Sequence, residues 1–203
     1  MAEGSQKTSG KTKVVIAEDE GIVRLDLKET LEEEGYEVVG ETGNGDEVEA
    51  LVERTRPDVV ILDIKLLGED GISVARRLKE RGDVAIVMLT AFSQRDVVSE
   101  AIGAGALGYL VKPFQRSDLV PAIEVALARH KEMRALAEEV ESLEEMLETR
   151  KVVDRAKGRL MDDYGMSEAE AYRFIQQAAM RRRLTMRRVA ELILEGVVKK
   201  ADY

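Results

Sequence analysis

The chain has 203 residues, 44% of them hydrophobic and only 4% aromatic, so it can bury an aliphatic core in a domain of about 100–150 residues plus a smaller one. It has no cysteine and one histidine, which excludes disulfides, thiol chemistry and zinc sites made of thiolates or several imidazoles. The net charge of −9 is uneven, because residues 149–203 hold 13 Lys/Arg and 8 Asp/Glu, a local charge of +5, whereas residues 1–148 carry −14.

The first part of the chain alternates short β-branched runs with longer amphipathic segments. Residues 1–12 precede it and predict a flexible tail, with no apolar region of the signal-peptide kind. No apolar run approaches the ~20 residues of a membrane span, so we expect a cytoplasmic protein. The expected strands are 14–17, 37–40, 59–62, 85–89 and 107–111, and the expected helices lie near 20–34, 45–55, 71–81 and 94–104. This alternation predicts an α/β fold with a parallel sheet and right-handed crossovers.

After Pro113 the pattern becomes helical, with Ser117 or Asp118 as the expected start. Apolar residues then recur at steps of three, four or seven: Leu119, Ala122, Ala126, Met133, Leu136, Val140, Leu143 and Leu147. One interpretation is a helix packed on the sheet and continued by an exposed charged linker. The other is that a helical linker over 131–148 pairs with a second copy as a parallel coiled coil.

The basic end of the chain contains no strand pattern. We expect three helices, over roughly 149–163, 167–181 and 185–198. Ser167 with Glu170 forms a capping-box pattern, and Thr185 is a candidate N-cap. Three short helices joined by tight turns predict a small bundle.

Polar residues of complementary chemistry stand where the expected strands end. They are Glu18 and Asp19 after the first strand, Asp63 after the third, Thr90 at the fourth and Lys112 at the fifth. The carboxyl ends of parallel strands share one edge, so these side chains should gather there. Clustered carboxylates without cysteine or histidine nearby favour Mg²⁺. The set predicts a phosphoryl site, with a carboxylate that attacks and an ammonium and a hydroxyl that bind phosphoryl oxygens.

These residues, with Gly71 eight positions after Asp63, resemble the receiver domain of two-component response regulators over residues 13–130. The resemblance implies a flavodoxin-like doubly wound (βα)5 fold, a sensor histidine kinase as partner and Asp63 as phospho-acceptor. It also implies that Mg²⁺ is bound by Glu18, Asp19, Asp63 and the backbone carbonyl of Lys65. Thr90 and Lys112 would contact the phosphoryl group, Tyr109 would be the aromatic switch, and the Lys112–Pro113 bond would be cis.

Two positions depart from that family. Leu66-Leu67 replaces the common Met-Pro, which leaves the conformation of that loop open, and Glu18 stands where an Asp is common. An alternative is an aspartyl-phosphate phosphatase of the haloacid-dehalogenase kind. Such enzymes need a second Asp two residues after the nucleophile, and here that position is Lys65. A slowly decaying phospho-switch, not an enzyme, is therefore favoured.

The string Arg-Ala-Lys-Gly-Arg-Leu-Met at residues 155–161 and the Ala/Met spacing after it are similar to the ANTAR output module, which we place at 143–203. This resemblance implies binding of RNA hairpins that overlap a terminator and transcription antitermination. We expect a homodimer on phosphorylation, formed through the face of the fourth helix, fifth strand and fifth helix or along residues 119–147. The implied RNA contacts are Arg155, Lys157, Arg159, Tyr172, Arg183 and Arg187. The implied packing positions are Ala156, Gly158, Ala171, Ala178 and Ala190.

Two other outputs remain open. A DNA-binding response regulator needs a recognition helix with polar base-reading residues, whereas the last expected helix is largely apolar beyond its first turn. A protein-binding output is the other alternative, and in it the cations would only be solvated.

Overall fold

The computed structural model describes residues 10–91 and 95–198. The chain divides into two compact units, residues 1–134 and 135–203. Most of the tail predicted over residues 1–12 lies outside the described residues. The domain boundaries near residues 130 and 143 stay predictions.

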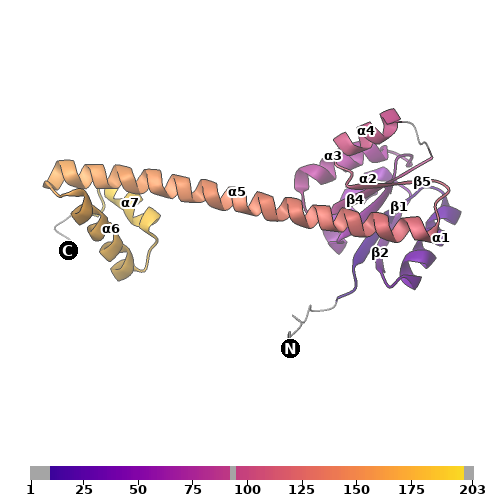
Figure 1. Cartoon of the computed structure of the whole chain (residues 1–203), viewed down its shortest axis with the longest axis horizontal. Helices are drawn as coiled ribbons and strands as arrows, with labels where there is room; N and C mark the ends of the chain where they lie inside the picture. Colours follow the sequence, from indigo (N-terminus) through magenta and orange to yellow (C-terminus); the bar gives the residue numbers. More distant parts are fainter. Residues whose placement is uncertain (1–9, 92–94, 199–203) are drawn as a thin grey trace. The chain divides into compact units, whose positions relative to one another are not determined.

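In the described part of the first unit, five parallel strands form one sheet in the order β2-β1-β3-β4-β5 (Figure 1). The strands are β1 (Lys13–Ala17), β2 (Glu37–Thr42), β3 (Val59–Asp63), β4 (Ala85–Thr90) and β5 (Gly108–Val111). The order reverses direction at β1, as it does in doubly wound sheets. The α/β fold predicted from the alternating pattern is confirmed.

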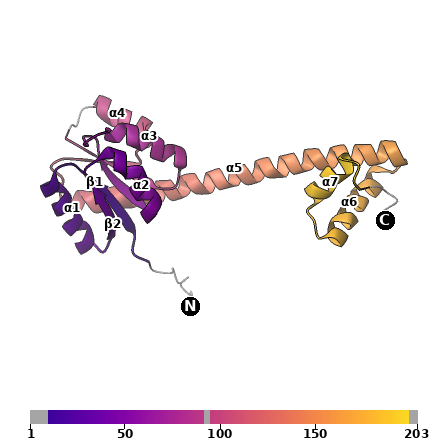
Figure 2. The same ribbon diagram turned by 180° about the vertical axis from the view of Figure 1, so that it is seen from behind.

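Helices cover both faces of this sheet. They are α1 (Gly21–Glu33), α2 (Gly45–Thr55), α3 (Gly71–Arg81), α4 (Arg95–Gly103) and the start of α5 (Arg116–Tyr164). Neighbouring strand residues point to opposite faces: Val14 packs with α1 and α5, and Val15 packs with α2, α3 and α4. The start of α5 accordingly crosses in front of the sheet in Figure 1 and behind it in Figure 2. The strands are apolar on successive positions because both faces are buried.

Helix α5 corrects one prediction. The expected break near residue 149 does not exist, because α5 is continuous over 49 residues from Arg116 to Tyr164. The prediction relied on a change in composition, whereas residues 145–152 contain neither proline nor glycine to end a helix. The helix begins at Arg116, next to the expected start at Ser117 or Asp118. At this end the Asp118 carboxylate accepts a hydrogen bond from the Gln115 N–H at 3.0 Å.

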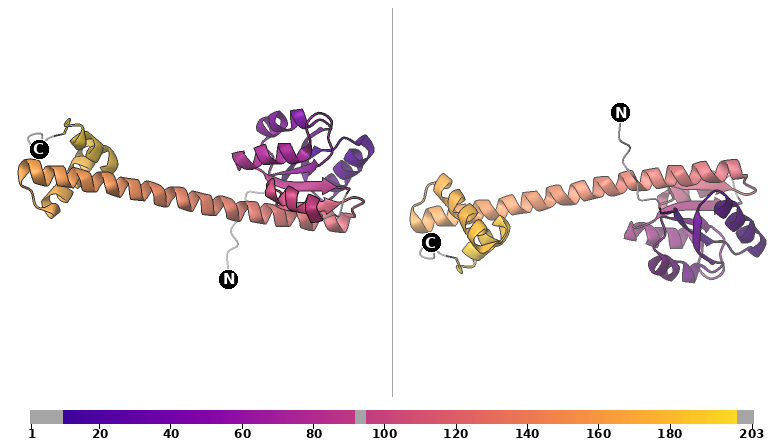
Figure 3. Two further views of the ribbon diagram at one scale, coloured as in Figure 1. Left: turned by 90° about the horizontal axis from the view of Figure 1, so that it is seen from above. Right: turned by 90° about the horizontal axis from the view of Figure 1, so that it is seen from below.

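In the second unit, the end of α5 packs with α6 (Glu168–Arg182) and α7 (Met186–Leu194) (Figure 3). The two caps expected from the sequence are present: Ser167 and Glu170 form the capping box, and the Thr185 side chain accepts from Arg188 N–H. The helix expected to reach residue 198 ends at Leu194, before Gly196 with φ +79°.

Four of the five implied packing positions are confirmed, because Ala156, Ala171, Ala178 and Ala190 are fully buried. Gly158 is a correction. A Cβ built on Gly158 would meet nothing within 4 Å among the described residues. Its sequence neighbours Ala156 and Leu160 face the bundle, and the 100° step per residue turns Gly158 away from it.

Candidate functional site

Strands β1, β3, β4 and β5 are neighbours in the sheet, so the residues that end or directly follow them share one edge. The structure thereby brings together the residues singled out in the sequence, Glu18, Asp19, Asp63, Thr90 and Lys112. Glu18, Asp63 and Thr90 are buried there. Buried carboxylates require a compensating positive charge.

Lys112 supplies that charge to two carboxylates at once. Its Nζ lies 2.7 Å from Oδ2 of Asp63 and 2.5 Å from Oε2 of Glu18. Burial is the largest single effect and lowers the pKa of Lys112, but the hydrogen bonds to Asp63 and Glu18 and the negative charges of both together outweigh it, so the net shift is upward. The ammonium therefore stays protonated between the two acids.

Glu18 remains incompletely satisfied. Burial raises the pKa of the Glu18 carboxyl group. The hydrogen bond from Lys112 partly offsets this rise, and the nearby charge of Asp63 adds to it. Oε1 accepts from Glu20 N–H at 3.1 Å, whereas Oε2 has no hydrogen-bond partner beyond the Lys112 ion pair within the described residues. One ammonium shared by two buried carboxylates leaves net negative charge at this edge.

A small cavity of about 130 Å³ opens at the same place, lined by Asp19, Glu20, Asp63, Ile64, Lys65, Thr90, Ala91 and Lys112. Carboxylate oxygens of Glu18, Asp19 and Glu20 lie within 4.8 Å of one another. Oxygen ligands around excess negative charge fit Mg²⁺. Glu20 was missed in the sequence analysis, although its position as a third consecutive acid after β1 could have indicated it.

The remaining predicted receiver residues line this cavity or lie close in sequence to a residue that lines it. Lys65 and Asp63 both line the cavity. The Asp63 carboxylate pairs with Lys112 and is not part of the cluster formed by the carboxylates of Glu18, Asp19 and Glu20. Tyr109 is half exposed on β5, three residues before Lys112. The Lys112–Pro113 bond is cis, as the resemblance implies.

The loop that carries Leu66-Leu67 in place of the common Met-Pro is ordered by hydrogen bonds. Leu67 N–H donates to Gly43 O at 3.0 Å, and Leu67 O accepts from Gly45 N–H at 2.9 Å. Proline at position 67 could not donate the first of these bonds. This chain therefore attaches the loop to the turn before α2 through the Leu67 backbone.

Gly71 allows α3 to begin directly against the end of β3. A Cβ at Gly71 would lie 1.9 Å from the backbone oxygen of Asp63. We expect Gly71→Ala to lower the free energy of unfolding by about 2 kcal/mol, because the start of α3 must move away from β3. Gly103→Ala at the end of α4 is the matched control, since a Cβ there meets nothing within 4 Å among the described residues. Equal urea midpoints for the two variants would contradict the expectation.

In the second unit, three of the six predicted RNA-contact residues make ion pairs within the protein. Lys157 is only 14% exposed and lies 2.7 Å from both Asp154 and Glu168. Arg159 pairs with Asp163 and also donates to the carbonyl oxygen of Leu194. These contacts hold α5 to α6 and to the end of α7.

The Arg187 guanidinium lies 3.2 Å from a Glu191 oxygen, one turn along α7. Arg155, Tyr172 and Arg183 are exposed, and their side chains make no hydrogen bond or ion pair with the described residues. These three are therefore the members of the predicted set that are exposed and not held in ion pairs among the described residues.

Comparison with known proteins agrees with this geometry. The family model "Response regulator receiver domain" matches residues 14–124, and the family model "ANTAR domain" matches residues 141–194. The chain is 55% identical over 190 residues to "Transcriptional regulatory protein PdtaR" of Mycobacterium tuberculosis (strain ATCC 25618 / H37Rv), a match that covers 94% of this chain and 93% of that protein.

Two further proteins are similar over little more than half of the chain. The chemotaxis protein CheY of Thermotoga maritima is 37% identical over 112 residues, which is 55% of this chain and 93% of that protein. The solved receiver domain of the putative response regulator NarL from Mycobacterium tuberculosis superposes with a TM-score of 0.57 at 27% identity, covering 59% of this chain and 98% of that one. With sequence, fold and edge site in agreement, the chain belongs to the two-component response regulators that join a receiver domain to an ANTAR output domain, the PdtaR type.

Proposed function

We propose that this response regulator accepts a phosphoryl group on Asp63 from a sensor histidine kinase and thereby controls RNA binding by its second unit. The observation that carries the proposal is the single Lys112 ammonium held between Asp63 and Glu18 beside the acid-lined cavity. A carboxylate placed next to a cation and an oxygen-rich cavity is arranged to attack phosphorus.

In the transfer step, a carboxylate oxygen of Asp63 attacks the phosphorus of a phosphohistidine, the P–N bond breaks and an acyl phosphate forms. Glu18, Asp19, Asp63 and the Lys65 carbonyl would hold Mg²⁺, which when bound neutralises phosphoryl oxygens. Lys112 is protonated and within reach of the same oxygens. Thr90 lines the cavity and supplies a hydroxyl.

The residue two positions after Asp63 favours a phosphorylation switch over a phosphatase. A phosphatase of the alternative kind needs an acid two residues after the nucleophile to protonate its leaving group, and Lys65 occupies that position at the cavity. The added phosphoryl charge would draw Thr90 and Lys112 toward it, and the half-exposed Tyr109 would turn inward.

Dimerisation along α5 would connect the switch to the output. In the second unit, the apolar seam of Leu136, Val140, Leu143 and Leu147 is about half exposed. In the sequence, Met133 precedes this seam at the same spacing. Exposed apolar residues at heptad spacing favour pairing with a second copy. Two paired output units could bind two RNA hairpins with avidity and so prevent a terminator hairpin from forming. Because the kinase's ATP and nascent RNA are inside the cell, we also propose a cytoplasmic location.

The competing outputs differ in the nucleic acid that they bind. In α7, Val189, Ala190 and Ile193 are buried in the bundle, which leaves few positions for reading bases in a major groove. Among the residues that the structure describes, no helix is long and apolar enough to cross a membrane. The burial of this face of α7 favours RNA over duplex DNA as the ligand.

The test compares phosphorylated and unphosphorylated protein on a hairpin RNA with unpaired loop bases and on duplex DNA, over a series of salt concentrations. We expect phosphorylation to tighten binding to the hairpin, with log K falling linearly as log salt rises. Preferential binding to duplex DNA would instead identify a DNA-binding regulator. Binding to neither nucleic acid would favour a protein-binding output.

A further inference from the structure

The loop between β3 and α3, residues 64–70, directly follows the phospho-acceptor and contains Lys65. A backbone hydrogen bond closes it at its base, where Gly71 N–H donates to Ile64 O at 2.9 Å. Its middle is attached to the turn before α2 through the two bonds of Leu67. The position of Lys65 at the cavity therefore depends on where this loop is held.

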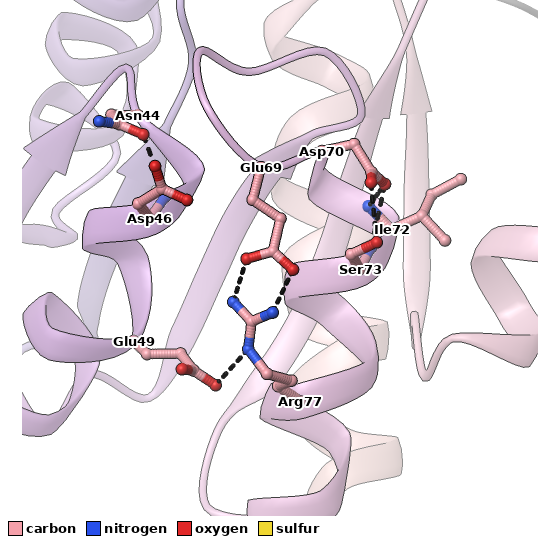
Figure 4. A network of polar contacts seen from close by, with 8 residues as sticks. All are labelled: Asn44, Asp46, Glu49, Glu69, Asp70, Ile72, Ser73 and Arg77. Carbon is pink, nitrogen blue, oxygen red and sulfur yellow. Dashed lines mark hydrogen bonds and ion pairs between the residues drawn. The ribbon is translucent and has the colours of Figure 1, made fainter.

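The loop and the turn before α2 also lie in close contact. A Cβ at Gly45 would come within 2.0 Å of the backbone oxygen of Glu69, and one at Gly68 within 2.4 Å of an Asp46 carboxylate oxygen. At the far end of the loop, Asp70 caps α3 by accepting from the N–H groups of Ile72 and Ser73 (Figure 4). Backbones packed at this distance cannot separate or slide without breaking these bonds.

Arg77 of α3 joins the loop to α2 through its side chain. Its guanidinium donates to both carboxylate oxygens of Glu69, and its Nε lies 2.9 Å from Glu49 of α2 (Figure 4). The hydrogen bonds to Glu69 are the main cause that raises the pKa of Arg77. A planar fork bonded to two oxygens restricts orientation as well as distance.

Glu69 and Glu49 need this cation. Glu69 is 26% exposed and Glu49 35% exposed, so neither is fully solvated, and without Arg77 between them the two carboxylates would repel. Repulsion would push Glu69, and the loop with it, away from α2. Arg81 of α3 also lies 3.9 Å from Glu53 of α2, but that ion pair does not include the loop.

We propose that Arg77 is a positioning residue for the phosphoryl site, acting through Glu69 to hold loop 64–70 and with it the backbone of Lys65. The proposal rests on the proposed function, in which the Lys65 carbonyl is a ligand of the divalent cation. Arg77 touches neither substrate nor metal in this role. Its effect is to keep one ligand in place before the cation arrives.

Arg77→Gln tests the proposal in the full chain, with Arg76→Gln as the matched control. Arg76 is the adjacent residue of α3, and its ion pair, with Glu100 at 3.2 Å, lies on an exposed surface away from the loop. We expect Arg77→Gln to speed amide hydrogen exchange at Gly45, Leu67 and Gly71 about tenfold in protein without Mg²⁺, and to weaken Mg²⁺ binding by a similar factor. The Arg76 variant should match the wild type in both measurements.

Saturation with Mg²⁺ separates positioning from general stability. If Arg77 acts on the metal ligand, phosphorylation by a small-molecule phosphodonor slows in the variant at low Mg²⁺ and recovers at high Mg²⁺. A variant whose unfolding midpoint falls while its loop exchange and Mg²⁺ affinity stay at wild-type values would overturn the proposal. A wild-type chain that binds no Mg²⁺ and accepts no phosphate would instead refute the proposed function, and loop exchange alone would then decide whether Arg77 holds the loop.

Discussion

Replacing Lys112 by Met is expected to lower the free energy of unfolding of the first unit by about 3 kcal/mol at neutral pH without divalent cations. The substitution keeps much of the side-chain volume but leaves the carboxylates of Glu18 and Asp63 buried together without their shared cation. Urea unfolding of the full chain measures the effect, with amide exchange in β1 and β3 assigning the transition to this unit. Adding Mg²⁺ should restore part of the loss, because a divalent cation replaces the missing charge.

The pH dependence of this loss follows from Glu18. Its pKa is already raised in the folded protein, mainly by burial, and removal of Lys112 raises it further. A raised pKa contributes stability below the ordinary value of 4.5, and that contribution is lost as the pH rises through the folded pKa. The difference between wild type and variant should therefore be smaller in mild acid than at neutral pH.

Lys28→Met is the matched control, because Lys28 pairs with Glu41 at 3.3 Å near the surface. We expect it to cost less than about 1 kcal/mol. If Lys28→Met and Lys112→Met destabilise equally, or if the Lys112 effect is independent of pH, the buried ion pairs do not govern this edge of the sheet.

Replacing Asp63 by Asn is expected to abolish phosphorylation and, with it, the phosphate-dependent gain in RNA affinity. The amide cannot attack phosphorus as a carboxylate does. Among the described residues, Glu18 is the one other carboxylate paired with Lys112, and Glu18 is buried and does not line the cavity. Incorporation of labelled phosphate and a hairpin-binding titration on the same preparation measure both effects. Retention of both by the variant would refute the switch.

Asp58→Asn serves as the control for this experiment. Asp58 precedes β3 at the opposite edge of the sheet, where it accepts a hydrogen bond from Lys13 N–H at 2.7 Å. We expect normal phosphorylation of this variant, because its carboxylate lies at the far end of the strand from the cavity. A matching loss in Asp58→Asn would mean that the Asp63 result reflects misfolding.

Local signals predicted most of the fold correctly. The strand runs are apolar on successive positions because both faces of the sheet are covered, and that pattern is visible without coordinates. The Ser167–Glu170 capping box likewise depends on residues close in sequence. Helix α5 shows the limit, since a change of composition near residue 149 is not a helix-breaking signal.

The sequence by itself determined the residue types at the candidate site, because in a parallel sheet the residues that follow each strand must share one edge. Only the tertiary structure decided how they pair: Lys112 between Glu18 and Asp63, and Arg77 between Glu69 and Glu49. It also showed that Lys157 pairs with Asp154 and with Glu168 of α6. The physical reason is that an ion pair between elements depends on strand register, helix rotation and side-chain reach, which neighbouring residues in the sequence do not specify.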